Sequence, residues 1–594
     1  MALAGLAVSA CSDEGGDGED DASVTTAASD PATRSTVSTV STIPTDDTVS
    51  DDLPADSAAA TAAMSVDPNP NNVLSAIVVV ESDEPVSVML TAVSGDHTVV
   101  VPQTAAVATS HTIPLVGMRS DRTYEVTAEL VTSDGEIVAG AAGSFETGSI
   151  PERFERYEFS SDPDRSSPGY TLIEMQRWVD PRSITPQQPF DNPQYLIAVD
   201  SAGEIVWYYE NGPVIGGVEQ TPDGTFTSFY WPNGVRRFDI LGNEVGDWQV
   251  PSKNAADPAD DESSATVPSG TTAAGPGIDA LDPLPVDSDD VVLKLIHHEA
   301  IRLDSGNYLA LSTASHELTP EQRRAFCPDD PTEFNALSDV AVEFEPSGRV
   351  VRTWDLWDAV DINVTPGREM CNEFFAVRND RDWTHANAVI YDEARDAVIF
   401  SARHTSQVVA MRHSDAEGPQ TDVLWIFGED GSVPLEGDIP QYQHAVEIED
   451  DGSLLLYDNG NGRAGTSLDD PVNPPFSRAV QYEVDDSSDD PADWVVRQLW
   501  EHRMDDLDGE PLFAPFIGDA DRVANGNVLI THGGIDFQNP MSYLHAAVVE
   551  VVPDDASGGD IVWEFRVGSA DRLSSIYRAE RIESFYVGAE WVDD

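Results

Sequence analysis

Apolar and polar residues alternate in short runs along most of the 594-residue chain, and this pattern predicts strands rather than helices. Between residues 66 and 149, the runs AIVVVES, VSVMLTAV, HTVVVP, TYEVTAELV and GSFETG each have the length and composition of a strand. Turn-forming residues separate these runs. We therefore expect a small β-sandwich at 66–149, with a structural or interdomain role and no chemistry of its own.

A repeated unit begins near residue 150. Turns that contain a glycine precede short apolar strands at Gly224, Gly306, Gly452 and Gly526. A second kind of strand centres on tryptophan and occurs six times, at Trp207, Trp248, Trp354, Trp425, Trp500 and Trp563. Six units of four short strands predict a six-bladed β-propeller over residues 150–594. The expected fold class is all-β, with helix favoured only at 318–326 and 570–582.

Two further features complete the predicted domain plan. The segment LVGMRSDRTY at 115–124 resembles the turn and tyrosine corner of fibronectin type III-like sandwiches, so the N-terminal domain is expected to be of that type. Two polar segments lack periodicity. Residues 12–65 are expected to form a disordered tether, and residues 253–290 a flexible acidic insertion in the propeller.

The formal net charge of −75 narrows the range of partners. Such a surface disfavours nucleic acid and anionic membranes, so neither is expected to bind. Solubility in a salty medium explains the charge more simply than an acidic-tail function does. Because the surface repels anions, any anion site must carry its own local positive charge. Arginine supplies nearly all of the basic residues, since lysine occurs only at Lys253 and Lys294.

Three cysteines bear on localisation. Cys11 ends the run Val-Ser-Ala-Cys, which looks like a bacterial lipobox, where the cysteine is lipidated after signal cleavage. The residues before it are too few for a complete signal, so 1–11 is interpreted as a partial one. A chance cysteine in a disordered start is the alternative. Export as a lipid-anchored protein would place Cys327 and Cys371 in an oxidising compartment, where they can pair.

Residues 381–404 predict a β-hairpin whose side chains can hold an anion. Two alternating runs flank a polar turn. A turn centred on Ala394 places His385 directly opposite Arg403, and it places Asn387 on the same side of the strand as His385. An imidazole, a carboxamide and a guanidinium on one face suit a tetrahedral anion. The alternative is a polar strand end with a structural arginine.

The glycine turns set a common register for the innermost strands. Counting eight residues back from them gives His298 and His444 in two repeats and a glycine in two others. With His385, three histidines then begin equivalent strands, and the starts of these strands should meet at one mouth of the central channel. Three histidines in register, beside an arginine, favour a functional site over three separate structural roles.

The same pairing rule gives three secondary candidates for contact with a substrate. It places Thr313 opposite His298, Asn459 opposite His444, and His532 opposite Asp519. His297 should point the other way from His298, toward the blade interior, and we expect it to be structural.

A transition-metal site is an alternative interpretation of the histidine cluster. Three histidines can ligate zinc or copper, and a carboxylate could complete the set. Arg403, however, lies opposite one of the presumed ligands, and its charge would repel a metal ion. An arginine among histidines suits an oxyanion better. The chain has no nucleophile elbow, phosphate-binding loop or dinucleotide fingerprint.

Several motifs together resemble the bacterial arylsulfate sulfotransferases (the arylsulfotransferase family). They are IHHEAIRL around His298, DWTHANAVIYDEARDAVIFSARH at 382–404, QHAVEIEDDGSLLLYDNGN around His444, and IYRAERIESFY near the C-terminus. The resemblance spans roughly residues 66–590, since family members also carry a small N-terminal β-domain before a six-bladed propeller. The insertion at 253–290 is extra.

The resemblance implies transfer of a sulfuryl group from an aryl sulfate to a phenol, through a transiently sulfated histidine and without a nucleotide sulfate donor. His444 matches the nucleophile. The residues that match those binding the sulfuryl oxygens or acting as acid or base are His298, His385, Asn387 and Arg403. Small-molecule donor and acceptor are then the expected partners, with no cofactor and no metal.

This chemistry is consistent with the residues themselves. Sulfuryl transfer should pass through a loose transition state, so positioning and charge stabilisation matter more than a strong nucleophile. A neutral imidazole can attack in line, Arg403 can pair with two oxygens, and His298 can protonate the leaving phenolate. We expect ping-pong kinetics. The alternatives are a non-catalytic binding propeller, a metal-dependent hydrolase or lyase on the same fold, and a sulfatase that uses water as acceptor.

Overall fold

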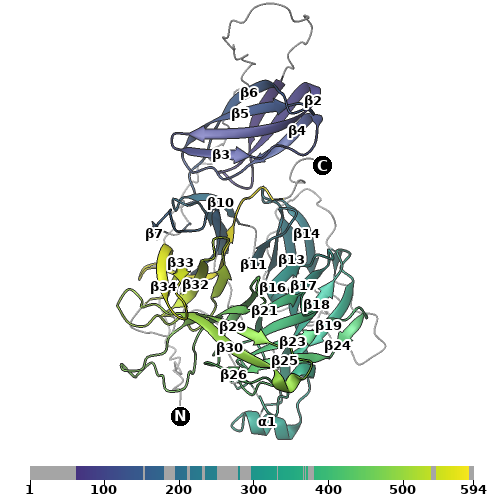
Figure 1. Ribbon diagram of the computed structural model, residues 1–594, viewed down its shortest axis with the longest axis vertical. Coiled ribbons are helices and arrows are strands. Elements are labelled where there is room, and N and C mark those ends of the chain that lie inside the picture. Colours follow the sequence, from purple (N-terminus) through teal and green to yellow (C-terminus); the bar gives the residue numbers. More distant parts are fainter. Residues whose placement is uncertain are drawn as a thin grey trace, which may run out of the picture. The chain divides into compact units, whose positions relative to one another are not determined.

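The structure is a computed structural model (Figure 1). It describes residues 62–151, 154, 156–178, 194–210, 215–230, 234–249, 279–280, 296–330, 332–365, 367, 369–371, 380–536 and 543–587. The predictions for Cys11, for most of the tether and for nearly all of the acidic insertion lie outside these residues. Within them, no helix is long and apolar enough to cross a membrane.

The N-terminal domain is a sandwich built around one long strand. Its strands are β1 (Ala62–Pro68), β2 (Ala76–Ser94), β3 (His97–Val101), β4 (Ala108–Leu115), β5 (Thr123–Val131) and β6 (Ile137–Glu146). The first half of β2 pairs with β1 and β4, and the second half pairs with β3 and β5. The predicted tyrosine corner is present, since the Arg119 N–H donates to the buried Tyr124 hydroxyl at 2.8 Å. The first strand begins at Ala62, earlier than the expected boundary at residue 66.

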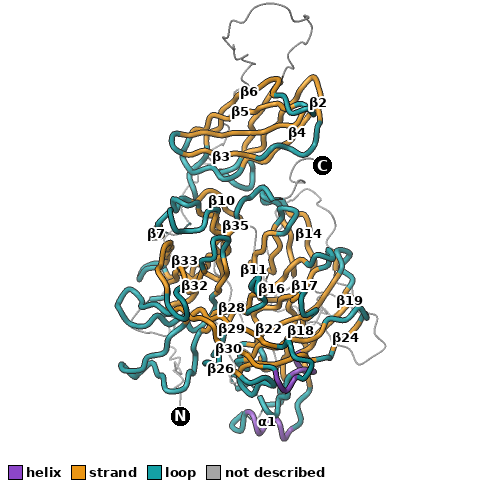
Figure 2. Tube along the Cα trace, in the orientation of Figure 1, coloured by secondary structure: helices purple, strands orange, loops and turns teal. Residues whose placement is uncertain are grey.

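Six further sheets form the blades of a propeller, as the repeats predict (Figures 1 and 2). In each of blades 2 to 6, four strands follow one another in chain order from the channel outward. Blade 2 consists of β11 (Ile215–Gln220), β12 (Phe226–Tyr230), β13 (Gly234–Phe238) and β14 (Glu244–Gln249), and blade 3 of β16 (Ile296–Arg302), β17 (Tyr308–His316), β18 (Asn335–Phe344) and β19 (Val350–Asp355). Blade 4 consists of β21 (Ala386–Asp392), β22 (Ala397–Ala402), β23 (Gln407–Arg412) and β25 (Val423–Gly428), blade 5 of β27 (His444–Ile448), β28 (Leu454–Asp458), β29 (Arg478–Asp485) and β30 (Val495–His502), and blade 6 of β31 (Asp519–Arg522), β32 (Val528–Ile535), β33 (His545–Pro553) and β34 (Gly559–Val567).

The two ends of the propeller sequence close the ring. Blade 1 consists of β8 (Tyr170–Trp178), β9 (Gln194–Val199) and β10 (Ile205–Tyr209), and the last strand of the chain, β35 (Leu573–Ile582), is its innermost strand. At the other end, β7 (Tyr157–Ser161) pairs with β34 as the outer edge of blade 6. The innermost strands β11, β16, β21, β27, β31 and β35 contact one another in a closed circle, so they enclose the channel.

Short additional strands extend some blades, and helix is confined to small segments (Figure 2). The extra strands are β15 (Asp279–Ala280), β20 (Asp380–Asp382), β24 (Gly418–Gln420) and β26 (Leu435–Glu436). The helix expected at 318–326 is present as α1 (Pro320–Phe326), begun by a capping box between Thr319 and Gln322. A second helix, α2 (Leu356–Ala359), is shorter. The prediction of a helix at 570–582 is wrong. This segment contains the strand β35, which pairs with β8 along its length.

The repeated tryptophans all lie on the fourth strand of a blade, counted from the channel. Four of them donate an indole N–H to a carbonyl oxygen of the next blade: Trp207 to Ile240, Trp248 to Pro346, Trp354 to Arg412 and Trp500 to Gly558, at 2.8 to 3.1 Å. The tryptophan repeat is therefore a device that joins neighbouring blades.

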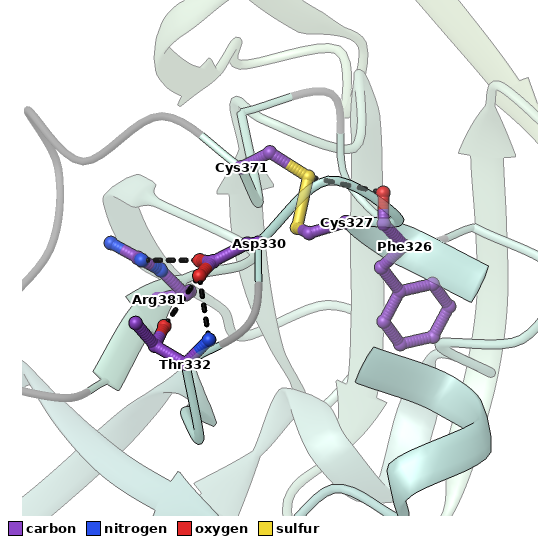
Figure 3. Close-up of a disulfide and its surroundings, with 6 residues drawn as sticks. All are labelled: Phe326, Cys327, Asp330, Thr332, Cys371 and Arg381. Atoms are coloured by element: carbon purple, nitrogen blue, oxygen red, sulfur yellow. Dashed lines mark hydrogen bonds and ion pairs between the residues drawn. A yellow bond between two sulfur atoms is a disulfide. The ribbon is translucent and has the colours of Figure 1, made fainter. Parts of the chain in front are cut away.

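The predicted pairing of Cys327 with Cys371 is confirmed (Figure 3). The two Cα atoms are 5.5 Å apart, and Cys327 is the residue that ends α1. Close to the disulfide, the Asp330 carboxylate accepts from Thr332 and pairs with Arg381 at 2.7 Å. Arg381 is the first residue of the hairpin predicted at 381–404, so its ion pair with Asp330 connects the loop near the disulfide to this hairpin.

The inter-blade hydrogen bond can be tested with two matched tryptophans. Trp354 and Trp425 are both almost fully buried, but the Trp425 indole nitrogen has no hydrogen-bond partner among the described residues. Both Phe variants lose the same side-chain volume. Trp354→Phe should therefore lower the free energy of unfolding by about 1 kcal/mol more than Trp425→Phe, measured by chemical denaturation. Equal losses would contradict this role of the indole.

Candidate active site

The innermost strands bulge where the sequence places its histidines. Backbone pairing shifts register between His297 and Ala300 in β16, between Ala386 and Ala388 in β21, and between His444 and Val446 in β27. His298 and His385 have positive φ values of 59° and 46°. Such angles cost energy for residues with a Cβ atom, and bulges re-aim side chains. The fold thus maintains local strain at the residues that line the channel.

His385 lies at the centre of a row of three imidazoles. Its ring centroid is 5.0 Å from that of His298 and 4.4 Å from that of His404. The Asp382 carboxylate lies 2.5 Å from His385 Nδ1. A proton on Nδ1 is therefore held by the carboxylate, so chemistry at His385 must use Nε2.

One buried carboxylate, that of Asp339 on β18, supports both His298 and His385. Its Oδ2 accepts the Ala386 backbone N–H at 2.7 Å and the Thr384 hydroxyl, on either side of His385. Its Oδ1 lies 3.2 Å from His297 Nε2, and His297 Nδ1 lies 2.7 Å from His298 Nδ1. His297 is buried, but its ring contacts that of His298, so the prediction that it points the other way from His298 is wrong.

His444 is held as a neutral imidazole with a defined tautomer. The Asn459 amide donates to the carbonyl oxygens of Ala514 and Ile517, so its oxygen must face His444 Nδ1, 2.6 Å away. Nδ1 therefore carries the proton and Nε2 carries the lone pair. The Ile517 N–H points to Nε2 at 3.3 Å, as this tautomer requires. Burial first, and then the charge of Arg403, hold the His444 pKa well below its usual range.

Arg403 supplies the local positive charge that an anion needs on this acidic protein. Its backbone N–H donates to His385 O at 3.2 Å, which confirms the predicted cross-strand pair. The guanidinium donates to Pro515 O at 3.0 Å and lies over the Tyr442 ring at 4.8 Å. Among the described residues it forms no ion pair, and the side chain is only 6% exposed. Burial lowers its pKa, yet a guanidinium stays charged, so its charge is available to a bound anion.

Comparison with known proteins shows to which protein family this chain belongs. The family model for arylsulfotransferase matches residues 159–578, and the model for the arylsulfotransferase Ig-like domain matches residues 63–142. The chain belongs to the arylsulfotransferase family. The two matches fall on the propeller and on the sandwich.

Two relatives of this family carry the name arylsulfate sulfotransferase AssT. The protein from Escherichia coli O6:H1 is 23% identical over 408 residues, which is 58% of this chain and 58% of the relative. The protein from Lelliottia amnigena is 22% identical over 553 residues, or 76% of this chain and 81% of the relative. This chain thus aligns with less than two thirds of the E. coli protein. The crystal structure of a protein of unknown function from Bacteroides caccae is 12% identical, with a TM-score of 0.35, and the match covers 70% of this chain and 98% of that one.

Two of the cross-strand pairs predicted for this chain are wrong by register. Thr313 was expected opposite His298, but His298 lies in the bulge without a cross-strand partner, and Ile296 pairs with Ser312. His532 was expected opposite Asp519, which instead pairs with Thr531. The His532 ring bonds the Tyr457 hydroxyl at 2.8 Å, and burial lowers its pKa to about 3. His532 therefore belongs to the packing between two blades.

Two other predicted residues, Asn459 and Asn387, lie at the site but make other contacts than those expected. His444 pairs with Tyr457 rather than Asn459, yet Asn459 contacts the His444 ring through its side chain. The Asn387 carboxamide donates to Gln443 O at 2.8 Å, next to His444. The register break beside Asn387 interrupts the strict alternation that was expected to place it with His385.

Besides Asp339, four residues of the site were not predicted. Asp382 and His404 lie within the conspicuous hairpin, but the alternation of the strands gave no reason to select them. Tyr577 and Arg578 lie on β35, the segment that was expected to be helical. The Tyr577 hydroxyl donates to His298 O at 3.2 Å, and Arg578 donates to Asn387 O at 2.9 Å. A strand assignment for this segment would have placed both in the channel.

The neutral state of His444 predicts a pH effect on stability. Its pKa is lowered in the folded protein, whereas in the unfolded chain it is about 6.5. The unfolded chain therefore takes up a proton first as the pH falls, and the stabilising contribution of His444 decreases below about pH 6.5. The free energy of unfolding of the wild type should fall relative to that of His444→Gln by about 1–2 kcal/mol between pH 7 and pH 5. A difference that is constant with pH would contradict the neutral assignment.

Proposed function

We propose that this chain is an arylsulfate sulfotransferase that works through a sulfohistidine at His444, without a nucleotide sulfate donor and without a catalytic metal. Family membership supports the aryl sulfate donor and the phenolic acceptor. The observation that carries the mechanism is a neutral His444 imidazole with its lone pair on Nε2, on which the charge of Arg403 acts. His444 Nε2 is the nucleophile that the Asn459 contact prepares, and Arg403 is the charge that attracts a sulfate ester.

In the first half-reaction, His444 Nε2 attacks the sulfur atom in line. The nitrogen–sulfur bond forms as the bond from sulfur to the phenolic oxygen breaks. Arg403 stabilises the non-bridging oxygens, and the buried site strengthens this interaction. His298, whose ring lies beside His385, provides a second imidazole next to the same oxygens.

The leaving phenolate needs a proton, and we assign its donor to His385. The Asp382 carboxylate accepts the His385 Nδ1–H and fixes the ring, so Nε2 is the atom that can exchange a proton with the phenolic oxygen, whereas burial and neighbouring charges hold the pKa of His298 well below its usual range. In the second half-reaction, neutral His385 accepts the proton of the incoming phenol, whose oxygen attacks the sulfur and releases His444. This revises the acid–base role that the sequence alone assigned to His298.

A metal-dependent hydrolase is a less suitable interpretation of the same residues. Asp382, His385 and His404 offer ligand atoms within 4.8 Å of one another. However, the Asp382 oxygen and His385 Nδ1 are 2.5 Å apart, whereas two ligands of a tetrahedral zinc ion lie about 3.3 Å apart. The pair is thus spaced for a hydrogen bond. Arg403 follows the strand that pairs with β21 and adds an opposing charge.

We also propose that the protein is exported and anchored by a lipid on Cys11. The disulfide between Cys327 and Cys371 supports the oxidising compartment, because structural disulfides form mainly outside the cytoplasm. The strongly negative charge supports the absence of nucleic-acid partners.

Transfer kinetics test the roles of His444 and Arg403. His444→Ala should abolish phenol-stimulated release of 4-nitrophenol from 4-nitrophenyl sulfate. Arg403→Ala should lower kcat by about 10²–10³-fold, which is the loss expected for one preorganised oxyanion donor. Release is followed by absorbance, with chelator present and no nucleotide donor. His502→Gln, a buried histidine in an outer strand, is the control and should keep its activity. Full activity in His444→Ala would remove the proposed nucleophile.

The acid–base role of His385 predicts a change in pH dependence. Asp382→Asn removes the carboxylate that accepts the His385 Nδ1–H, so a positive charge on this ring would no longer be balanced by a neighbouring negative charge. The basic limb of the pH profile for release from 4-nitrophenyl sulfate should move to lower pH, with an effect on kcat larger than on KM. An unchanged pH profile with a uniformly lower rate would assign Asp382 a structural role only.

A further inference from the structure

The channel holds a second polar site that sulfuryl transfer does not use. A cavity of about 360 Å³ lies among the innermost strands, and seven carboxylate side chains line it. We call it the acidic chamber. Three of its side chains, Glu447 from β27 and Asp519 and Asp521 from β31, bring carboxylate oxygens within 4.8 Å of one another.

The charges in the acidic chamber are poorly balanced. Arg578 is the one basic residue among the described residues that line it, and it pairs with Glu299 at 2.6 Å. The Glu174 carboxylate instead accepts hydrogen bonds from the backbone N–H groups of Gly217 and Val218, at 3.2 and 2.7 Å. The remaining five carboxylates form no ion pair with any described residue.

Some carboxylate oxygens in the acidic chamber also lack hydrogen-bond donors. Glu219 Oε2 and Glu580 Oε2 are buried and have no hydrogen-bond partner among the described residues. Both side chains line the cavity. A buried carboxylate without a donor or a counter-ion is costly, and here several converge on one space. Asp521 Oδ2, on one of the three convergent side chains, is likewise buried and has no hydrogen-bond partner among the described residues.

We propose that the acidic chamber binds one divalent cation, Ca²⁺, on the carboxylates of Glu447, Asp519 and Asp521. Ca²⁺ takes six to eight oxygen ligands at about 2.3–2.6 Å and tolerates irregular geometry, which suits carboxylates from separate strands. The cavity leaves room for water to complete the coordination. Mg²⁺ requires a smaller octahedral arrangement and keeps most of its water, so it fits a site of many carboxylates less well.

Such an ion would stabilise the propeller rather than take part in the transfer. Its ligands come from β27 and β31, the innermost strands of two neighbouring blades. Arg578 lies between the acidic chamber and the histidines, since it contacts both Glu299 and Asn387 O. A bound cation would therefore join blades 5 and 6 at the channel and relieve the repulsion among the carboxylates.

Calcium content and thermal unfolding of the full chain test this proposal. Protein stripped with EGTA is dialysed against Ca²⁺ and then against metal-free buffer, and the retained metal is counted by mass spectrometry. We expect one retained Ca²⁺ per chain and a rise in Tm of about 2–5 °C with millimolar Ca²⁺, larger than with Mg²⁺. The variant Glu447→Gln/Asp521→Asn should retain no Ca²⁺. In EGTA it should unfold at a higher temperature than the wild type, because like charges have been removed.

A matched control is needed because the acidic surface binds cations weakly everywhere. Glu510→Gln/Asp469→Asn removes the same two charges from exposed positions and should behave as the wild type does. Equal Ca²⁺ retention and equal Tm shifts in all three proteins would mean adventitious surface binding only, and would overturn the proposal. Wild-type protein that retains no Ca²⁺ and shows no Tm shift would also overturn it, and would mean that the carboxylates hold protons instead. Should the double variant not fold, Glu447→Gln alone serves the same comparison.

Discussion

The site depends on closure of the propeller ring. β35 pairs with β8 and β7 pairs with β34, so the first and last blades are each completed by a strand from the far end of the propeller sequence. The candidate site takes its side chains from blades 3, 4 and 5, and Tyr577 and Arg578 of blade 1 contact the backbone of His298 and Asn387. Without the closed ring, these groups would not face one channel. The indole bonds between neighbouring blades strengthen the same ring from outside.

Inside the ring, a small set of polar contacts fixes each imidazole. Asp382 holds His385, Asn459 holds His444, and Asp339 reaches His298 through His297. These contacts define which ring nitrogen carries a proton before any substrate arrives. Arg403 then adds a positive charge that no described carboxylate neutralises. On a protein with a net charge of −75, this local charge is what makes an anionic substrate acceptable.

Most of the fold could be predicted from the sequence, because the tryptophan strands and glycine turns recur in every region of the propeller. The pairing of His385 with Arg403 was predicted correctly although the ladder beside the turn is one residue off a turn centred on Ala394, because the bulge between Ala386 and Ala388 restores the predicted register. Errors came from the turns and from the bulges. In the ladder of Asp519 no bulge occurs, and an offset of one residue at the turn was enough to misplace His532. For Thr313 the same offset at the turn combined with the bulge at His298. The acidic chamber could not be foreseen, because its carboxylates are far apart in sequence and meet only through closure. Tyr577 and Arg578 were missed for a related reason. Residues 570–582 were predicted to be helical, because their pairing partner, β8, lies about 400 residues earlier in the sequence and could not be recognised from it.

The central claim is that His444 carries the sulfuryl group between donor and acceptor. The most direct test is peptide mapping by mass spectrometry, on protein mixed with 4-nitrophenyl sulfate without acceptor and quenched at alkaline pH. We predict one sulfo group on the peptide that contains His444, which disappears when phenol is added before the quench. A label on any other residue, or no label during active turnover, would contradict the proposed mechanism.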